Sequence, residues 1–367
     1  MLRETYLTGK FRRKTPGLGG AMRLKKKRAV TTTLGSIVAV VVALGAPGCG
    51  GGTDQGEVQA VSADEIARQK EIHAAEVETW HAERLASLQA EGGWLSLVGL
   101  FWLEDGDNTV GSDASAVVRL PESVPASVGT LSLSRTAAGP TVTFATSPEL
   151  TSPELTSPEL TGSGELTVEP AVDLGAPITL VSDLHEEPTT LRHGSVSFYL
   201  IERGDRVGIR VKDSASAVRT AFAGIERFPV TFDWRLVTEY RPRTEAKTLQ
   251  IPTAIGTVDD MASPGTIHFE KDGRSFQLDA FEGSDAQEVW FVFGDLTNAK
   301  TTYGGGRFLY SRFTDGDASQ AGSLVVDFNR AYNPPCVFTP YATCPLPTLE
   351  NRLDIAVEAG EKVWGKH

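Results

Sequence analysis

The sequence is poor in cysteine and in the short motifs that mark known reactions. Only three cysteines occur in 367 residues, and one of them, Cys49, lies near the N-terminus. The patterns GxSxG, HExxH and GxxxxGKS are missing, and so is a GxGxxG between a strand and a helix. The sequence therefore names no reaction and no cofactor.

The chain also lacks an uninterrupted apolar run of the roughly 20 residues that a spanning helix needs. The stretch from Ala29 to Leu44 is shorter and contains three threonines, a glycine and a serine. The basic run RLKKKR follows Met22, and small residues ending in APGCGGG follow the apolar stretch. This order predicts an export signal over residues 1–49, with translation starting at Met1 or Met22.

The residues around Cys49 resemble a bacterial lipobox, in which the cysteine is acylated and becomes the mature N-terminus. Ala46 stands where that pattern favours leucine, and Pro47 is unusual, so ordinary signal cleavage is the alternative. Residues 50–61 would form a flexible tether. We expect an extracytoplasmic cell-envelope protein that is attached to a membrane through a lipid anchor.

Basic residues become scarce once the signal is removed. Residues 50–367 hold 25 Lys and Arg against 46 Asp and Glu, a net charge of about −21. Such a charge repels nucleic acid and anionic headgroups. We expect no nucleic-acid partner, and the sequence does not indicate an oligomeric state.

Cys336 and Cys344 are eight positions apart, in a protein expected in a compartment where disulfides persist. We expect a disulfide between them, and free structural thiols or a reactive thiol are the alternatives. The bridge would stabilise the fold by roughly 2.5 kcal/mol in the chain-entropy account. No CxxC pair or nearby histidine accompanies them, so we expect no metal here.

Residues 62–91 predict one amphipathic helix. Ser62 and Glu65 form a capping box, apolar residues recur at helical spacing, and two glycines end the pattern. His73 and His81 lie in this helix at a spacing of eight, whereas two metal ligands on one helix face are four apart. They are better interpreted as surface or interface residues.

From residue 92 the chain changes to short runs rich in β-branched and aromatic residues, separated by Gly, Asp and Pro. These runs predict a mainly β fold: an antiparallel sandwich or barrel assembly of many short strands, preceded by the N-terminal helix. Because no linker is evident, residues 92–367 are expected to be a single domain. The repeat TSPELTSPELTSPELT at residues 146–161 predicts an exposed loop.

The segment from Asp327 to Lys362 organises the rest of the chain. It holds two cysteines, two consecutive prolines and three asparagines, between the strand-like runs SLVVDF and RLDIAV. Proline excludes a regular helix or a central strand in its middle. We expect a rigid loop that presents polar side chains from a scaffold.

Four long strings carry a family likeness: GWLSLVGLFWLEDGDNTVGS, ERGDRVGIRVKD, FVFGDLTNAKTTYGGGRFLY and DFNRAYNPPCVFTPYATCPLPTLENRL. Together they resemble the bacterial family known as domain of unknown function 1684, over roughly residues 75–362. The resemblance implies a mostly β domain, often secreted or lipid-anchored, with no established activity.

Polar residues in the last two strings are the candidates for a catalytic site. They are Asp295, Thr297, Tyr303, Arg307, Asp327, Asn329, Tyr332 and Asn333. An aspartate beside an arginine can act as a general base, and a tyrosine or asparagine can stabilise an oxyanion. A functional site should gather them around one cavity, with Tyr303 and Trp94 or Trp102 as its apolar wall. In the alternative, Asp327 and Arg307 form a buried pair and the asparagines satisfy turn backbone.

The string ERGDRVGIRVKD forms a second polar cluster. In a strand, Arg206 and Arg210 share one face, opposite the apolar residues. A solvated face or a salt-bridge ladder is favoured there over an anion site. The glycines before Arg307 favour a tight turn over a phosphate-binding nest, and the spacing of His185 and His193 is only a weak metal pattern.

These observations favour an exported bacterial lipoprotein whose β domain binds a small-molecule ligand or acts as a scaffold. The alternative is a hydrolase-like enzyme that uses the Asp, Arg, Tyr and Asn polar site.

Overall fold

The computed structural model describes residues 62–151 and 165–365. The predicted signal, Cys49 and the predicted tether lie outside these residues, as does most of the TSPEL repeat. The described residues from Ala67 onward belong to one compact unit, and Ser62–Ile66 belong to a second. Among the described helices, none combines the length and the apolar character of a membrane span.

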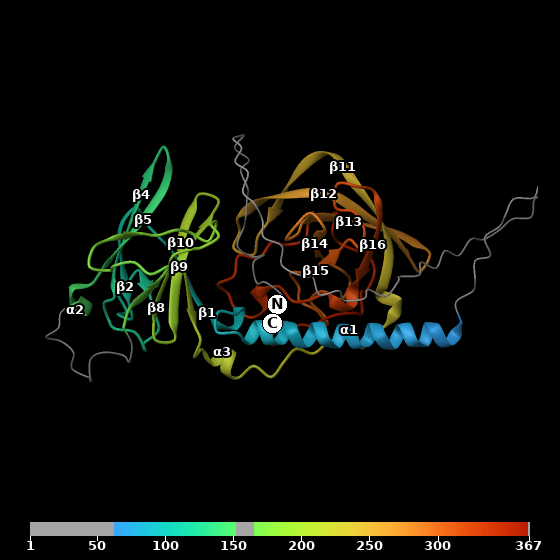
Figure 1. Cartoon of the computed structure of the whole chain (residues 1–367), viewed down its shortest axis with the longest axis horizontal. Coiled ribbons are helices and arrows are strands. Elements are labelled where there is room, and N and C mark those ends of the chain that lie inside the picture. The colour runs from blue at the N-terminus through green and yellow to red at the C-terminus, as the bar shows by residue number, and fades with distance from the viewer. Residues whose placement is uncertain (1–61, 152–164, 366–367) are drawn as a thin grey trace, which may run out of the picture. The chain divides into compact units, whose positions relative to one another are not determined.

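The predicted N-terminal helix is confirmed as α1 (Ala63–Gln89). Ser62 Oγ accepts a hydrogen bond from the Glu65 backbone N–H at 3.2 Å, as the capping box predicts. The buried residues of α1 are His73, Val77, His81 and Leu88, which form one stripe at helical spacing. Two of these four buried residues, His73 and His81, are histidines. The helix runs alongside the C-terminal sheet (Figure 1).

Two five-stranded sheets follow, with the orders β1-β10-β9-β8-β6 and β3-β2-β4-β5-β7. The first consists of β1 (Leu97–Trp102), β6 (Thr167–Glu169), β8 (Thr190–His193), β9 (Val196–Arg203) and β10 (Arg206–Asp213). The second consists of β2 (Gly106–Gly111), β3 (Val118–Arg119), β4 (Gly129–Thr136), β5 (Gly139–Thr146) and β7 (Ile178–Thr179). All neighbours pair antiparallel except β2 and β3, which are parallel.

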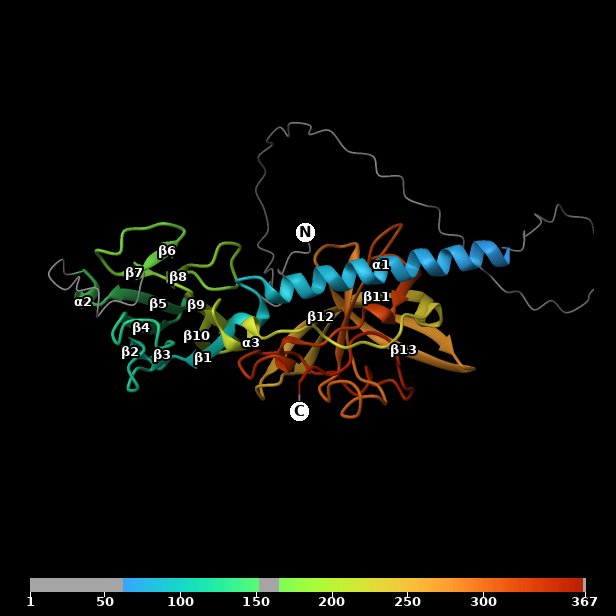
Figure 2. The same ribbon diagram turned by 90° about the horizontal axis from the view of Figure 1, so that it is seen from below.

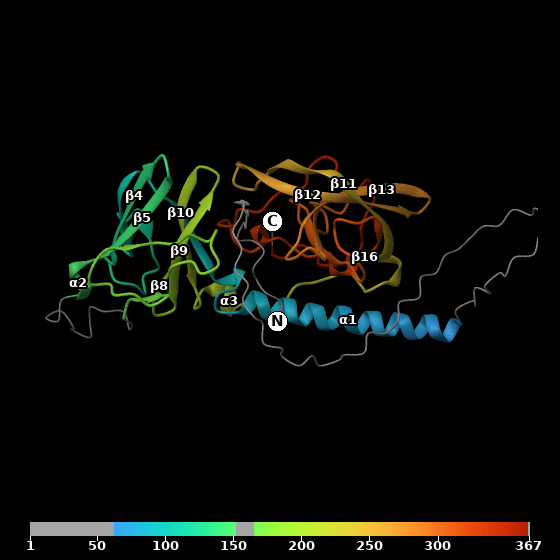
Figure 3. The same cartoon turned by 45° about the horizontal axis from the view of Figure 1, so that its top comes forward.

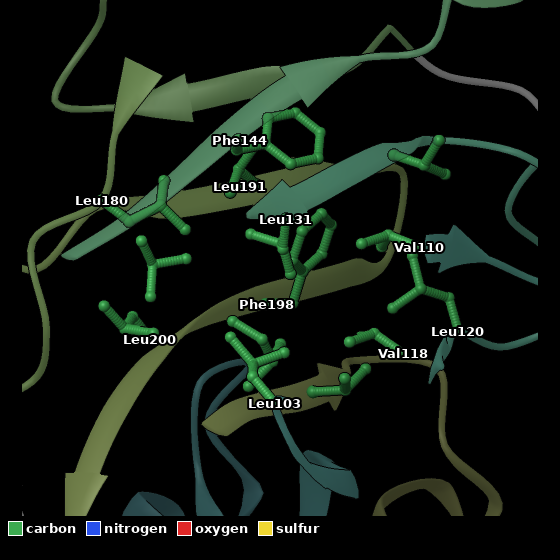
Figure 4. Packing of buried hydrophobic residues seen from close by; sticks show 14 of the residues in the cluster. Leu103, Val110, Val118, Leu120, Leu131, Phe144, Leu180, Leu191, Phe198 and Leu200 are labelled. Carbon is green, nitrogen blue, oxygen red and sulfur yellow. The ribbon is translucent and has the colours of Figure 1, made fainter. Parts of the chain in front are cut away.

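These two sheets share one apolar core. Figure 4 shows Leu131 and Phe144 of one sheet facing Leu191 and Phe198 of the other. The rings of Phe144 and Phe198 meet edge to face with centroids 6.2 Å apart. Because side chains alternate along a strand, β9 and β10 place most of their apolar residues in this core, whereas Tyr199, Ile201 and Arg210 lie on the opposite face.

The third sheet has six antiparallel strands in the order β15-β14-β13-β12-β11-β16 and curves into a half-barrel (Figure 3). Its strands are β11 (Arg235–Pro252), β12 (Val258–Lys271), β13 (Arg274–Glu282), β14 (Glu288–Phe293), β15 (Arg307–Arg312) and β16 (Gly322–Asp327). Phe291 and Trp290 belong to different apolar clusters, one on each face of the sheet. Burial on both faces explains why β14 is almost entirely apolar. The mainly β prediction is therefore confirmed, and the domain boundaries stay a prediction.

The few remaining helical elements are short. They are α2 (Pro148–Thr151), α3 (Ala217–Thr220), η1 (Trp94–Ser96), η3 (Phe232–Trp234), η4 (Phe328–Arg330) and η5 (Pro335–Val337). Ser216 caps α3 by accepting from Arg219 N, and Asp213 accepts from Ala215 N in the preceding turn.

The segment from Asp327 to Lys362 is irregular, as its prolines predict, and parts of it, drawn in red in Figure 1, lie between α1 and the third sheet. Figure 2, seen from below, shows α1 running along the third sheet. Phe308 of β15 and Tyr332 exchange two backbone hydrogen bonds of 2.9 Å. A disulfide joins Cys336 and Cys344, whose Cα atoms are 6.2 Å apart. Cys344 belongs to the apolar cluster that contains Trp290, so the loop covers the face of the third sheet on which Trp290 lies.

The expected strand at RLDIAV, residues 352–357, is wrong. Alternate residues are buried, but only Arg352 makes a ladder-type bridge, to Gly294. Other backbone groups bond to the loop after β14: Ile355 O accepts from Leu296 N at 3.1 Å, and Val357 N donates to Asp295 Oδ1 at 3.2 Å. A loop provides no continuous row of partners, so the extended segment forms no strand.

The core shared by the first two sheets predicts a sharp contrast between two identical substitutions. Leu131→Ala removes a side chain that is completely buried there and should lower the free energy of unfolding by about 2–5 kcal/mol. Leu296→Ala, at a half-exposed position, should change it by less than about 0.5 kcal/mol. Urea unfolding followed by fluorescence measures both, and equal effects would contradict this packing.

Candidate functional site

Helix α1 is attached to the Asp327–Lys362 segment through buried polar groups. His73 Nε2 lies 2.8 Å from Asp327 Oδ2. Asp327 Oδ1 accepts from Asn329 N at 3.1 Å and from Asn329 Nδ2 at 2.8 Å, which completes the cap of η4. Burial alone would raise the pKa of Asp327, but the hydrogen bonds from His73 and Asn329 outweigh burial and leave the pKa below its ordinary value.

Arg84 makes a second polar contact about three turns further along α1. Its Nη2 donates to Asn333 O at 2.9 Å, and its Nε lies 3.4 Å from Glu361 Oε1. Its guanidinium carbon lies 4.6 Å from the centre of the Tyr332 ring, in cation–π geometry. Burial lowers the pKa of nearby His81, although Glu361 acts in the opposite direction. The helix is therefore joined to the loop at both ends of its buried stripe.

Asp295 and Arg307 form a completely buried ion pair. Arg307 Nη2 donates to Asp295 Oδ2 and to Val357 O, both at 2.8 Å, and Nη1 donates to Ala359 O. The other Asp295 oxygen accepts from Thr297 N at 2.8 Å. The alternative that paired Arg307 with Asp327 named the wrong aspartate. With both charges paired and hydrogen-bonded, the group has the features of a structural ion pair.

The two candidate asparagines bind backbone groups. Asn329 Nδ2 donates to Thr231 O at 2.8 Å, and Asn329 Oδ1 accepts from Thr231 N at 3.0 Å. Asn333 Nδ2 donates to Lys362 O at 2.7 Å, and its backbone N–H donates to Glu361 Oε2 at 2.7 Å. Both residues thus tie irregular backbone to neighbouring segments.

Tyr303 begins the glycine-rich turn that leads into β15. Its carbonyl accepts from Gly306 N at 3.1 Å, so the segment is the tight turn that the sequence favours. Gly306 has a φ of +86°, and an added Cβ would lie 2.6 Å from Phe293 O. Burial raises the pKa of the Tyr303 phenol. Tyr303 and Trp94 pack against the same apolar cluster, whereas Trp102 stacks with Arg206 elsewhere.

The candidate residues thus form separate groups, centred on Asp295 with Arg307, on Asp327 with His73, and on Asn333 with Glu361. Two hollows of the described surface are lined by other residues. One lies along α1 and includes Trp80, and the other lies between β11 and β16 and includes Val237. Within residues 62–151 and 165–365, no cluster of three or more metal-ligating side chains occurs.

A different group of polar and aromatic residues gathers on the outer face of β9 and β10. Arg210 pairs in register with Tyr199 across the two strands. The guanidinium carbon of Arg210 lies 5.3 Å from the Trp94 ring, and Lys212 Nζ lies 5.8 Å from that ring. The expectation of a solvated face is wrong for Arg210, which is only 1% exposed.

The electrostatics of this group are distinctive. Burial would raise the pKa of the Tyr199 phenol, but the charges of Arg210 and Lys212 and a hydrogen bond with Arg210 hold it below its ordinary value. We name Trp94, Tyr199, Arg210 and Lys212 the Arg210 cluster. The alternation of polar and apolar residues in ERGDRVGIRVKD predicted that Arg206 and Arg210 share one face of the strand. The cluster itself could not be predicted, because it depends on the register of β9 and β10 and on the position of Trp94.

We predict that breaking the Asp295–Arg307 pair destabilises the protein strongly. Arg307→Met leaves a buried carboxylate without its cation and should lower the free energy of unfolding by about 3–5 kcal/mol. Arg312→Met on the same strand removes a half-exposed pair with Asp285, and its effect should be below about 1 kcal/mol. Urea unfolding of both variants measures the difference, and a small loss for Arg307→Met would favour a functional role instead.

The lowered pKa of Asp327 predicts a loss of stability in acid. The unfolded chain binds a proton at Asp327 near pH 3.9, whereas the folded chain resists protonation to lower pH. The stability that the ionised group contributes is present above that pH and is lost as pH falls through the folded pKa. Asp327→Asn should flatten the dependence of melting temperature on pH below about 4, and Asp205→Asn at an exposed position should not. Identical profiles for wild type and Asp327→Asn would contradict this contribution.

Comparisons with known proteins place part of the chain in a family. Residues 220–362 match the family described as Protein of unknown function (DUF1684). A solution NMR structure of an uncharacterised protein of Haloarcula marismortui is 29% identical, and the alignment covers 39% of this chain and 78% of that chain with a TM-score of 0.34. A comparison with curated proteins found no match. The family resemblance of the sequence is thereby confirmed over its C-terminal part, and residues 220–362 are a DUF1684 domain.

Proposed function

We propose that the protein is an exported binding protein of the bacterial cell envelope, anchored to a membrane by acylation of Cys49. The Cys336–Cys344 disulfide is the observation that carries this proposal. The Cα separation of 6.2 Å lies within the roughly 4.4–6.8 Å that disulfides require, so the loop accommodates the bridge. Disulfides persist mainly outside the reducing cytoplasm. The order of basic, apolar and small residues before Cys49 supports the same location.

Binding is favoured over catalysis by the contacts of the candidate residues. A general base must reach the proton that it abstracts, and an oxyanion donor must be free to bind the oxyanion. Asp295 is occupied by Arg307 and Thr297, and Asp327 by His73 and Asn329. These contacts give the hydrolase-like alternative no support. We propose that the β domain binds a small ligand through a few polar groups and aromatic rings.

We predict that Cys49→Ala releases the protein from the membrane. Acyl chains supply the hydrophobic anchoring, and alanine cannot be acylated. Wild type expressed in a bacterium should enter the detergent phase in phase partitioning, and its N-terminal peptide should carry the mass of a lipid-modified cysteine.

The Cys49→Ala variant should remain in the aqueous phase. Cys336→Ser is the matched control, because it removes a cysteine but should leave partitioning unchanged. If wild type and Cys49→Ala both stay in the aqueous phase, the anchor is refuted. Alkylation of Cys336 and Cys344 in the native exported protein would refute the location in an oxidising compartment.

A further inference from the structure

The Arg210 cluster contains a buried cation that lacks a counter-ion. Arg210 is 1% exposed, and its Nε and Nη2 have no hydrogen-bond partner in the described part of the chain. No acidic side chain among the described residues forms an ion pair with it, and the nearby Asp183 is held by Arg203 through two hydrogen bonds of 3.1 and 2.7 Å. The positive charge of Arg210 is therefore buried away from water without a paired negative charge.

The two other buried arginines of the described residues each have a carboxylate partner, which Arg210 lacks. Arg307 is paired with Asp295, and Arg203 is paired with Asp183. Taking a guanidinium out of water is strongly unfavourable unless an anion and hydrogen-bond acceptors replace the water. Arg210 has cation–π contact with Trp94 and a hydrogen bond with the Tyr199 phenol, and these leave one whole edge of its guanidinium unsatisfied.

That edge has a defined geometry. The N–H groups of Nε and Nη2 lie side by side and point in nearly parallel directions, so they match the two oxygens of one carboxylate. Lys212 adds a second positive charge, while its Nζ already donates to Gly92 O. The lowered pKa of Tyr199 reports the positive potential that these two residues create. Trp94, Tyr199 and Lys212 are each only half-buried, so the cluster lies near solvent.

We propose that the Arg210 cluster binds a small organic carboxylate. Arg210 would hold the carboxylate through Nε and Nη2, Lys212 would add electrostatic attraction, and the rings of Trp94 and Tyr199 would contact the apolar part of the ligand. A carboxylate is favoured over phosphate or sulfate because the two donors of the guanidinium edge match both of its oxygens, whereas a tetrahedral anion would place further oxygens against the apolar rings of Trp94 and Tyr199. The inference rests on the proposed binding function and gives its ligand a chemical class.

The test uses the full-length chain in detergent micelles, with acetate and benzoate as probes and chloride as reference at equal ionic strength. Carboxylate should raise the melting temperature of wild type by about 5 °C when its concentration is roughly a hundred times its Kd. Arg210→Met should lose this response. Arg206→Met is the matched control, because Arg206 lies on the same strand and face but stacks on Trp102, 3.9 Å from the ring centre, and it should respond like wild type.

A second measurement covers the case in which Arg210→Met does not fold. A bound carboxylate offsets the positive charges beside Tyr199, so acetate should raise the pKa of its phenol in wild type. Ultraviolet absorbance of tyrosinate during a pH titration measures this shift, and Tyr199→Phe identifies the signal.

The proposal is overturned if wild type shows no shift with either probe, or if Arg210→Met responds as strongly as wild type. Equal stabilisation by phosphate, sulfate and carboxylates would overturn the choice of a carboxylate. Neither readout depends on acylation of Cys49, which is measured by mass, so failure of the anchor and failure of the carboxylate site are distinguishable.

Discussion

The arrangement of the C-terminal domain depends on one buried guanidinium. Arg307, the first residue of β15, binds the aspartate that follows β14 and the carbonyls of Val357 and Ala359. It thereby fixes two strand ends and the terminal segment to one point. The same segment places Glu361, whose carboxylate accepts from Asn333 N and lies beside Arg84. A continuous series of polar contacts therefore connects the third sheet to helix α1.

The elements that local pattern determines were predictable, and the partners of buried polar groups were not. Capping residues and helical spacing gave α1, and the short alternating runs gave a mainly β fold. Arg307 was paired with Asp327 in the sequence-based alternative because both lie in polar strings, yet the turn after β14 brings Asp295 to it instead. Asp327 finds its partner in His73, on a helix far away in the sequence. Such pairings depend on tertiary packing, which no local pattern encodes.

Burial of Arg210 illustrates the same limit. The alternation of β10 predicts that Arg210 and Val211 face opposite sides of the sheet, and the structure agrees. A polar face is normally solvated, so the sequence favoured water as the partner of Arg210. Trp94, in η1 shortly after α1, packs its ring 5.3 Å from the guanidinium carbon of Arg210, which is 1% exposed. Whether a strand face is covered is decided by residues more than a hundred positions away.

The contacts of α1 also determine at which stage of folding the helix can pack against the rest of the protein. His73 and Asp327 are 254 residues apart in the chain, and Arg84 and Asn333 are 249 apart. Contacts across such long separations form late, because they carry the loop-closure entropy of nearly the whole chain. During translation, α1 is synthesised long before its partners. Half of the buried stripe is histidine, and an imidazole can hydrogen-bond to water until the last segment of the chain is in place.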